Sequence, residues 1–334
     1  MKNKRWRIGT LVLITVLLVV GAYWKLRTPP AREKQRLTVG IATWAGFGTG
    51  MVAMEKGFFR TIHLETRTLD DARARQAAFA SGGLDIMISS VDLYAQEAVK
   101  GIPGQIFLIT DESRGGDGIV ARPEIRTIAD LRGKKVAYAH GGPSDYLLFK
   151  ALDGAGVALG EVRRIAVDDP SRAGETFMSG DVDAAVTWEP FLSQAAKSGR
   201  GHILATTKDY PEIIVDILVA SDKLAANEEL LRQFMDGWLE SVEFIQKNAD
   251  EAATIMANGL NIPKEDVKGM MAGLRFADRN RNRYFFDSAG PEGTRLARLL
   301  NEAGAYWKLI GVVVVPLEGA SRVSATACRY FNSN

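Results

Sequence analysis

A seven-residue pattern, Phe-x-Ser-Gly-x-x-Asp, occurs twice in the chain, at residues 79–85 and again at residues 177–183. Each copy is typical of a helix end, a Gly suited to a left-handed cap, and then a short apolar strand. These strands are expected at residues 86–88 and 184–186. The repeat indicates two lobes of similar build, although shared helix-to-strand punctuation alone would also explain it.

Polar residues follow both of these apolar strands. Ser89 and Ser90 follow the first strand, and Thr187, Trp188 and Glu189 follow the second. In open α/β sheets, ligands bind beyond the carboxyl ends of the strands. The pattern therefore predicts a ligand site that is lined from both lobes.

The surrounding residues extend each copy into an alternating series of strands and helices. The first series has expected strands at 36–42, 63–69, 86–89 and 105–110, and helices at 48–57, 70–79 and 91–99. The second has expected strands at 136–139, 163–167 and 184–186, and helices at 145–155 and 171–178. Such βαβ series predict parallel sheets with helices on both faces.

A last strand-like run at 213–220 is expected to return the chain to the first lobe. The residues beyond it read as mostly helical, with an irregular stretch at 280–290. We therefore expect lobe 1 to comprise residues 36–121 and 217–334, and lobe 2 to comprise residues 122–216. Two crossovers, near residues 121 and 215, would permit hinge closure of the lobes on a ligand.

Charge separates the N-terminal segment from the rest of the chain. The first 36 residues hold nine of the 42 Lys and Arg residues and one of the 40 acids, which leaves 33 basic residues against 39 acidic ones. The remaining body is mildly acidic, which argues against a nucleic-acid partner because such partners need clustered basic residues. The single cysteine, Cys328, permits no internal disulfide.

The N-terminus indicates export. Four basic residues precede an uncharged run at 8–24, and the polar, Pro-containing segment up to residue 35 follows it. This pattern is typical of a signal peptide or of a signal-anchor with its basic side in the cytoplasm. Cleavage after Ala22 and retention as a membrane tether both remain open. In either case we expect the body to work in the periplasm or another extracytoplasmic space.

Several segments together resemble the substrate-binding proteins of nitrate, sulfonate and taurine ABC importers. The resemblance covers about residues 36–325 and rests on Trp44, residues 115–120, 128–136, 182–190 and 216–220. It implies a type II periplasmic-binding-protein fold, a small-molecule solute and a permease subunit as partner. It also implies that the chain is no enzyme, is a monomer and needs no cofactor or metal.

Twelve residues are the candidate ligand contacts: Trp44, Ser89, Ser90, Asp117, His140, Gly141, Gly142, Ser144, Thr187, Trp188, Glu189 and Asp216. The turn at 141–144 opens a helix, whose free N–H groups and dipole favour an anion. Ser144, Ser89 and Ser90 could instead serve only as helix caps. The two Trp residues could grip a solute by their ring faces or could belong to the core.

Three of these candidates are acids next to expected strand boundaries. Asp117, Glu189 and Asp216 could receive a cationic group of the solute, or could pair internally with Arg114, Lys134 or a backbone N–H. The combination favours a sulfonate or taurine-like solute, or another amine-bearing acid. His140 could line the site or act in catalysis. The alternative function is therefore an enzyme on the same fold, similar to pyrimidine-precursor synthases or menaquinone-pathway enzymes.

Overall fold

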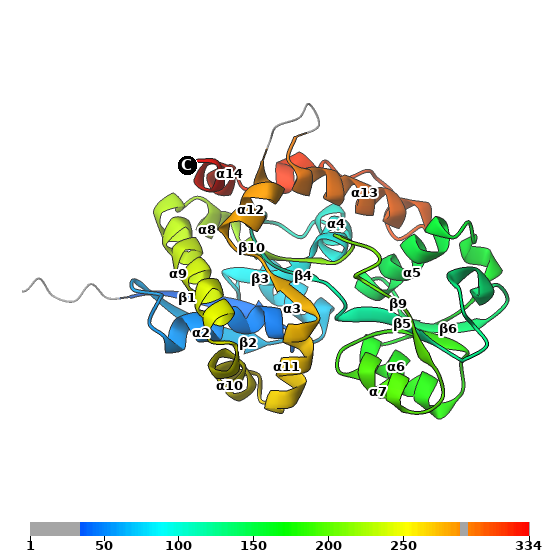
Figure 1. Ribbon diagram of the computed structural model, residues 1–334. Helices are drawn as coiled ribbons and strands as arrows, with labels where there is room; N and C mark the ends of the chain where they lie inside the picture. The colour runs from blue at the N-terminus through cyan, green and yellow to red at the C-terminus, as the bar shows by residue number, and fades with distance from the viewer. Residues whose placement is uncertain (1–33, 288–292, 334) are drawn as a thin grey trace, which may run out of the picture. The chain divides into compact units, whose positions relative to one another are not determined.

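The computed structural model describes residues 34–287 and 293–333, which form two β-sheets with their helices (Figure 1). The described strands of the first sheet lie in the order β11-β4-β10-β3-β1-β2, and those of the second in the order β7-β6-β8-β5-β9. The strands are β1 (Gln35–Ile41), β2 (Ile62–Thr68), β3 (Ile86–Ser90), β4 (Gln105–Ser113), β5 (Asp117–Ala121), β6 (Lys135–Ala139), β7 (Arg163–Val167), β8 (Ala184–Trp188), β9 (His202–Thr206), β10 (Val215–Ala220) and β11 (Leu274–Phe276). We call each sheet with its helices a lobe.

The two sheets have the same strand order once the short edge strand β11 is set aside. β2-β1-β3-β10-β4 in the first lobe corresponds to β7-β6-β8-β5-β9 in the second. This confirms the two similar lobes and the α/β class that the repeat indicated. Both sheets are mixed, however, because β10 runs antiparallel to β3 and β4, and β5 runs antiparallel to β8 and β9. The expectation of wholly parallel sheets was wrong, since each of these strands enters its sheet from the other lobe.

The first crossover lies earlier in the chain than expected. β5 pairs with β8 in the second sheet, with Asp117 opposite Trp188, so the chain leaves the first sheet at residues 114–116 and not near residue 121. The sequence around this crossover is polar and rich in glycine, with Ser-Arg-Gly-Gly-Asp at residues 113–117. The return passes through residues 207–214, close to the expected position near residue 215. The lobe limits as folding units stay a prediction.

Helices cover both faces of the sheets. In the second lobe, α5 lies on one face and α6 and α7 lie on the other (Figure 1). The helical elements are η1 (Ala45–Gly48), α2 (Thr49–Glu55), α3 (Ala72–Ala80), α4 (Val91–Val99), η2 (Ile128–Leu131), α5 (Pro143–Gly154), η3 (Leu159–Glu161), α6 (Pro170–Ser179), α7 (Phe191–Lys197), α8 (Asp222–Ala225), α9 (Glu228–Lys247), α10 (Ala249–Leu260), α11 (Lys264–Ala272), α12 (Arg279–Phe286), α13 (Arg295–Leu309), η4 (Gly319–Arg322) and α14 (Ala325–Asn332).

One helix replaces a segment that was expected to be irregular. α12 occupies most of residues 280–290, and Asp278 caps it by accepting the backbone N–H of Arg281. Its Arg-rich sequence hides the apolar face, which is formed by Phe285 and Phe286, both fully buried. Asn282 also faces inward and hydrogen-bonds the backbone of β4. Tertiary contacts therefore stabilise a helix that the local sequence does not favour.

The repeated pattern fixes the start of the central strand in each lobe. Gly82 and Gly180 adopt positive φ angles of 80° and 93° after α3 and α6, a conformation that favours glycine. Asp85 then accepts the backbone N–H of Thr38 at 2.9 Å, and Asp183 accepts that of Lys135 at 2.8 Å. In both lobes the Asp of the repeated pattern thus hydrogen-bonds the strand that runs parallel to the following strand. It lies at the amino ends of the strands, opposite the candidate ligand residues.

The apolar core is continuous between the lobes on one side. Residues of α5 such as Leu147 and Leu148 join the core of the first sheet, to which α13 also contributes Trp307. The face of the second sheet under α6 and α7 has a separate core around Phe177. The described residues contain no helix long and apolar enough to cross a membrane. The expected signal or anchor at residues 8–24 lies outside the described residues.

Candidate functional site

Two tryptophans from different lobes meet at the carboxyl ends of the strands. Trp44 follows β1 and Trp188 ends β8, and their rings stack with centroids 6.0 Å apart and planes inclined by 24°. Trp44 is buried, whereas Trp188 is only partly buried. The two lobes therefore touch through aromatic faces at the place where the sequence predicts a ligand.

The two crossover segments are hydrogen-bonded to each other beside this pair. The hydroxyl of Ser113 lies 2.8 Å from that of Thr207, which also accepts the backbone N–H of Gly115 at 2.7 Å. Gly116 donates to the carbonyl of Gly273 in the first lobe and accepts from Glu189 in the second. This short double connection is the only backbone passage between the sheets within the described residues.

Two carboxyl groups share the base of the site in the first lobe. Asp111 on β4 lies opposite Asp216 on β10, and the indole N–H of Trp44 donates to Asp111 at 3.3 Å. Burial, opposed by hydrogen bonds from Thr110, Trp44 and Asp216, raises the pKa of Asp111 to about 6. Burial and the charge of Asp111 raise the pKa of Asp216 well above its ordinary value.

The backbone closes tightly over this pair. A Cβ on Gly46 would lie 1.8 Å from a carboxylate oxygen of Asp111, so no side chain fits there without displacing the acid. The close approach explains the small residues of η1, which follows Trp44 directly. The indole N–H of the preceding Trp44 donates to the same carboxylate.

A third and a fourth acid approach from the second lobe. Asp117 begins β5, and burial raises its pKa to about 7, with the charges of Asp111 and Glu189 adding to the rise. Glu189 follows Trp188, but its carboxylate accepts the backbone N–H and the hydroxyl of Ser193 at 3.2 and 2.7 Å. Glu189 is therefore held internally, as the backbone-paired alternative expected, whereas Asp117 remains desolvated among other acids.

Polar groups without partners lie at the end of β3. Ser89 donates its hydroxyl to Glu97 at 2.9 Å, which leaves Ser90 at the N-cap of α4. Within the described residues, neither the Ser90 hydroxyl nor either carboxylate oxygen of Asp92 has a hydrogen-bond partner, although both residues are buried. Such groups are rare in native proteins because each loses its water without compensation. They mark this strand end as incomplete.

The charge of Asp92 is costly in this place. Burial raises the pKa of Asp92 to about 7. The nearby Ser90 hydroxyl and the backbone N–H groups of Asp92 and Leu93 limit this rise, although none of them forms a hydrogen bond of normal geometry with the carboxylate. The Asp92 charge in turn contributes to the raised pKa of Asp216 and of Tyr146 on α5. Its carboxylate is therefore near enough to Asp216 and to Tyr146 for its charge to act on both.

An acidic side chain lies in the first turn of α5, beside the expected anion position. Gly142 and not Ser144 is the N-cap, and Asp145 in the first turn accepts the backbone N–H of Gly141 at 3.1 Å. The same carboxylate lies 2.7 Å from Nδ1 of His140, whose side chain is half exposed. The Asp145 carboxylate thus accepts from the turn before the helix, and its negative charge disfavours a bound anion at this helix N-terminus.

Two contacts from the first lobe reach this turn. Tyr306 on α13 donates its hydroxyl to Asp145 at 2.8 Å, and its ring stacks on Phe149 with centroids 4.2 Å apart. Gln96 on α4 donates to the carbonyl of Gly141 at 2.5 Å. The neighbouring Trp307 donates to the backbone carbonyl of Asp92 at 2.6 Å. α13 therefore connects the unpartnered acid of the first lobe with the buried acid of the second.

The structure divides the predicted residues into three groups. It brings Trp44, Trp188, Asp117, Asp216 and Ser90 to the junction of the sheets, and it gathers His140, Gly141, Gly142 and Ser144 around Asp145. The third group, Ser89, Thr187 and Glu189, forms side-chain hydrogen bonds within its own lobe. Thr187, for example, donates to the carbonyl of Pro170 at 2.6 Å. The sequence reasoning missed Asp92, Asp111, Asp145, Gln96 and Tyr306.

A local signal was present for some of these missed residues. Asp92 and Asp145 each lie in the first turn of a helix that follows a candidate strand end, where an acid commonly serves the helix dipole. Asp111 lies within an apolar strand, which is unusual for a free carboxylate. Tyr306 gave no signal, because only the packing of α13 against α5 brings it to Asp145.

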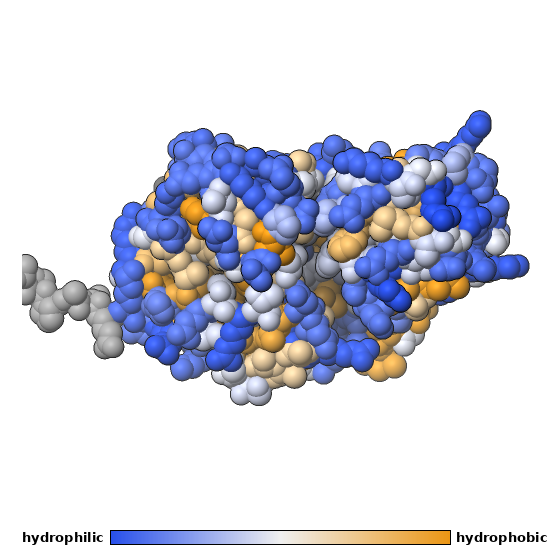
Figure 2. All heavy atoms as spheres, turned by 90° about the horizontal axis from the view of Figure 1, so that it is seen from below, coloured by the Kyte–Doolittle hydropathy of each residue, from blue (hydrophilic) through white to orange (hydrophobic). Residues whose placement is uncertain are grey.

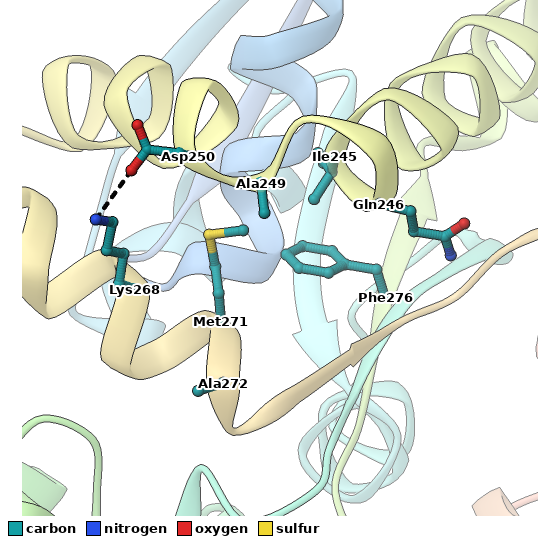
Figure 3. Close-up of a pocket in the computed structure, with 8 residues that line it drawn as sticks. All are labelled: Ile245, Gln246, Ala249, Asp250, Lys268, Met271, Ala272 and Phe276. Carbon is teal, nitrogen blue, oxygen red and sulfur yellow. Dashed lines mark ion pairs between the residues drawn. The ribbon is translucent and has the colours of Figure 1, made fainter.

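A pocket of about 480 Å³ lies elsewhere, between α9, α10, α11 and β11 (Figure 3). Its walls are mainly apolar, with Met271 and Phe276 pointing into it, and an Asp250–Lys268 ion pair of 2.9 Å stands at its rim. None of the twelve predicted residues lines it. The space-filling view shows a separate hollow near the middle of the face seen from below (Figure 2).

The junction has the chemistry of a recognition site for groups that donate hydrogen bonds. It combines two ring faces with desolvated carboxyl groups, and the ion pairs of the described residues include none with Asp92, Asp111, Asp117 or Asp216. Aromatic faces and carboxylates both attract cations. The internal acids at the starts of α4 and α5 disfavour an anion at these two helices.

Comparisons with known proteins agree with this architecture. The chain is 26% identical over 237 residues to a binding protein of Brucella abortus (strain 2308), covering 68% of this chain and 72% of that one. It is 25% identical over 226 residues to the taurine-binding periplasmic protein of Escherichia coli (strain K12), covering 63% of this chain and 68% of that one.

Solved structures share the fold. The periplasmic aliphatic sulphonate-binding protein of Escherichia coli superposes with a TM-score of 0.73 at 17% identity, over 90% of this chain and all of that one. A desulfurization enzyme superposes with a TM-score of 0.62 at 14% identity, over 90% of this chain and 99% of that one. The periplasmic-binding-protein fold expected from the sequence is therefore confirmed, and the fold also carries catalysts.

A family model assigns the chain more directly. The model described as NMT1/THI5 like matches residues 44–252, which is more than half of the chain. This range begins at Trp44 and includes all twelve candidate residues. The resemblance to solute-binding proteins, first drawn from short motifs, thus extends over both lobes. The chain belongs to the NMT1/THI5-like family.

Proposed function

We propose that this protein is the extracytoplasmic solute-binding component of an ABC importer. It captures a small organic solute between the carboxyl ends of the strands of its two lobes and delivers it to a permease. The observation that carries the proposal is the convergence of Trp44 and Trp188 from different lobes over the buried Asp111–Asp216 pair. Sequence relatives that are named for solute binding support the same function.

Capture would proceed by closure of the lobes about the two crossovers. Residues 114–116 and 207–214 are short and mutually hydrogen-bonded, which confines motion to a hinge. A solute that touches both ring faces binds the closed form more tightly than the open form. It therefore shifts the equilibrium toward closure by that difference in affinity, and the permease recognises the closed form.

The solute class follows from the groups at the junction. The buried acids favour an amine-bearing acid or a taurine-like solute over an inorganic anion such as nitrate. Trp44 and Trp188 supply apolar contact area for its carbon skeleton. A buried acid of the junction is the proposed acceptor of its amine.

Ligand screening of the full-length protein tests the proposal. Purified protein is heated with taurine, alkanesulfonates, amino acids, nitrate, aminopyrimidines or aromatic acids, and the unfolding midpoint is recorded. Binding to the native state at a hundred times Kd adds about 2.7 kcal/mol of stability. A shift of several degrees with one class supports capture, and no shift with any class after removal of carried-over ligand contradicts it.

Tryptophan variants locate the binding event. Trp44→Phe and Trp188→Phe are expected to remove most of the ligand-dependent change in fluorescence and to weaken binding. Trp238→Phe is the matched control, because Trp238 is buried against Phe234 in the first-lobe core and contacts neither ring of the pair. A ligand response that survives both site variants but is lost with the control places the binding elsewhere.

An enzyme on the same fold is the second candidate. The observation in its favour is the 2.7 Å contact between His140 Nδ1 and Asp145, which orients the imidazole as in a general base. Substitution of His140 by Ala separates the two functions. A binding protein loses affinity at most, whereas an enzyme loses turnover of a bound solute, measured as product released over hours by mass spectrometry.

A further inference from the structure

The start of α4 combines three features that are typical of a binding subsite. The Asp92 carboxylate is fully desolvated, the Ser90 hydroxyl beside it is equally buried, and neither has a partner within the described residues. Asp216 lies opposite Ser90 in the β3–β10 pairing. We define these three residues, Ser90, Asp92 and Asp216, as the acidic subsite.

Other buried acids of the protein do not share this condition. Glu97 on the same helix accepts from Ser89 and Gln76, and Glu112 on β4 is held by both arms of Arg281. Asp145 accepts from Tyr306 and from the backbone of Gly141. The fold thus supplies donors to the carboxylates of Glu97, Glu112 and Asp145 and, within the described residues, none to that of Asp92. An occupant with several N–H donors would complete the set.

The charge surrounding the acidic subsite selects the sign of the occupant. The groups whose charges act on it are other acids, Glu97 on Asp92 and Asp111 and Asp117 on Asp216. Arg75 is the basic residue whose charge interacts with Asp216, but its guanidinium donates to the carbonyls of Ile88 and Leu69. An anion at this position would be repelled by every carboxylate around it.

We infer that the solute presents an organic ammonium or amidinium group to the acidic subsite, where its N–H groups donate hydrogen bonds to the Asp92 carboxylate and to the Ser90 hydroxyl oxygen. This inference rests on the proposed capture function and narrows its substrate class. It assigns specificity to Asp92, which makes no hydrogen bond in the empty protein.

Paired probes test the inference on the full-length protein. Taurine and 2-hydroxyethanesulfonate differ only by ammonium against hydroxyl, and benzylamine and benzyl alcohol repeat the comparison with an aromatic skeleton. The ammonium member of the pair that fits is expected to bind at least ten-fold more tightly, as a charge-assisted hydrogen bond in a desolvated site implies. Titration calorimetry gives both dissociation constants.

Variants assign the preference to one carboxylate. In Asp92→Asn the ammonium preference is expected to fall below about three-fold, because the amide keeps the shape and removes the charge. Ser90→Ala should weaken the ammonium member by a smaller factor. Glu97→Gln is the matched control, a buried acid of the same helix that already has partners; because Glu97 acts on Asp92 only through its charge, this variant should keep most of the preference.

Each result has a distinct meaning. Equal binding of both members of a pair, or an unchanged preference in Asp92→Asn, overturns the subsite while solute capture stands. No binding by any probe or screened solute overturns capture and the subsite together. Stabilisation by Na⁺ or K⁺, measured against tetramethylammonium as the buffer cation and abolished by Asp92→Asn, identifies an inorganic ion as the occupant and also overturns the inference.

Discussion

The ends of β3 and β8 occupy equivalent places in two lobes with the same strand order, yet their side chains differ beyond the equivalent hydroxyls of Ser89 and Thr187, which both donate to internal partners. At the end of β8, Thr187 donates to Pro170 and Glu189 accepts twice from Ser193. At the end of β3, Ser90 and Asp92 are buried without partners in the described part of the chain. The same framework therefore carries an internally paired acid beyond β8 and, within the described residues, unpartnered polar groups at and beyond the end of β3.

The two copies become different only where the strands end. Upstream, Asp85 and Asp183 make the same hydrogen bond to the neighbouring strand, and Gly82 and Gly180 have the same left-handed conformation. These contacts define the framework and touch no candidate ligand residue. Four predictions below test how far the equivalence and the difference extend, from the largest expected effect to the smallest.

Removing either tryptophan separates stability from binding. Trp44→Ala is expected to destabilise the protein by about 3–5 kcal/mol, because Trp44 is buried and its indole donates to Asp111. Trp188→Ala should cost about 1–2 kcal/mol, because that ring is partly exposed. Urea unfolding measures both. Both variants should bind the solute weakly, so equal losses of stability would contradict the asymmetry between the two strand ends.

Neutralising the open carboxylate should stabilise the empty protein. Asp92→Asn is expected to gain about 1–3 kcal/mol at pH 8, since the pKa of Asp92 is raised to about 7 and its charge is then buried unpaired. As the pH rises from about 4, the unfolded state loses this proton first, so wild-type stability falls until about pH 7. The advantage of the variant should therefore be small at pH 5 and complete at pH 8.

Urea unfolding at pH 5, 6, 7 and 8 measures this difference. Asp117 and Glu97, whose pKa values burial also raises to about 7, lower the wild-type stability over the same range and remain in the variant. Only the difference between the two curves reports on Asp92. Parallel curves, or a variant less stable than the wild type at pH 8, would mean that Asp92 is compensated in solution.

The two strand-end hydroxyls should respond differently to removal. Thr187→Val is expected to cost about 1 kcal/mol, because it removes the donor of the hydrogen bond between the buried Thr187 and the partly buried carbonyl of Pro170. Ser90→Ala should be within about 0.5 kcal/mol of the wild type, since the hydroxyl that it removes has no partner in the described structure. Chemical denaturation compares the two. A large cost for Ser90→Ala would show that this hydroxyl is satisfied internally.

The shared framework should respond alike in both lobes. Asp85→Ala and Asp183→Ala each remove the acceptor of one backbone N–H at a strand start, and each is expected to cost about 1 kcal/mol. The ion pair of Asp183 with Arg122, at 3.1 Å and partly exposed, adds little. Solute affinity should be unchanged in both variants. A loss of affinity in either one would extend the site to the amino ends of the strands.

Local sequence carried much of this architecture. The alternation of apolar residues located most strands, and the Gly and Asp positions of the repeat located the helix ends, because caps and turns depend on a few neighbouring residues. It also identified Trp44, Trp188 and Asp216 as strand-end residues. Strand β5 and helix α12 were missed, since the apolar part of Asp117–Ala121 is short and follows a Gly-rich turn, and the Arg-rich Arg279–Phe286 buries its apolar face only in the folded protein.

The sequence by itself determined the family, the doubled βαβ framework and the positions of the strand ends, because these depend on periodicity and on short-range turn chemistry. Only the tertiary structure decided which polar side chains are satisfied. Tyr306 reaches Asp145 across 161 positions, and Trp44 reaches Asp111 across 67. Whether a buried carboxylate has a donor depends on such distant contacts, and for that reason the open state of Asp92 could be recognised only in the folded protein.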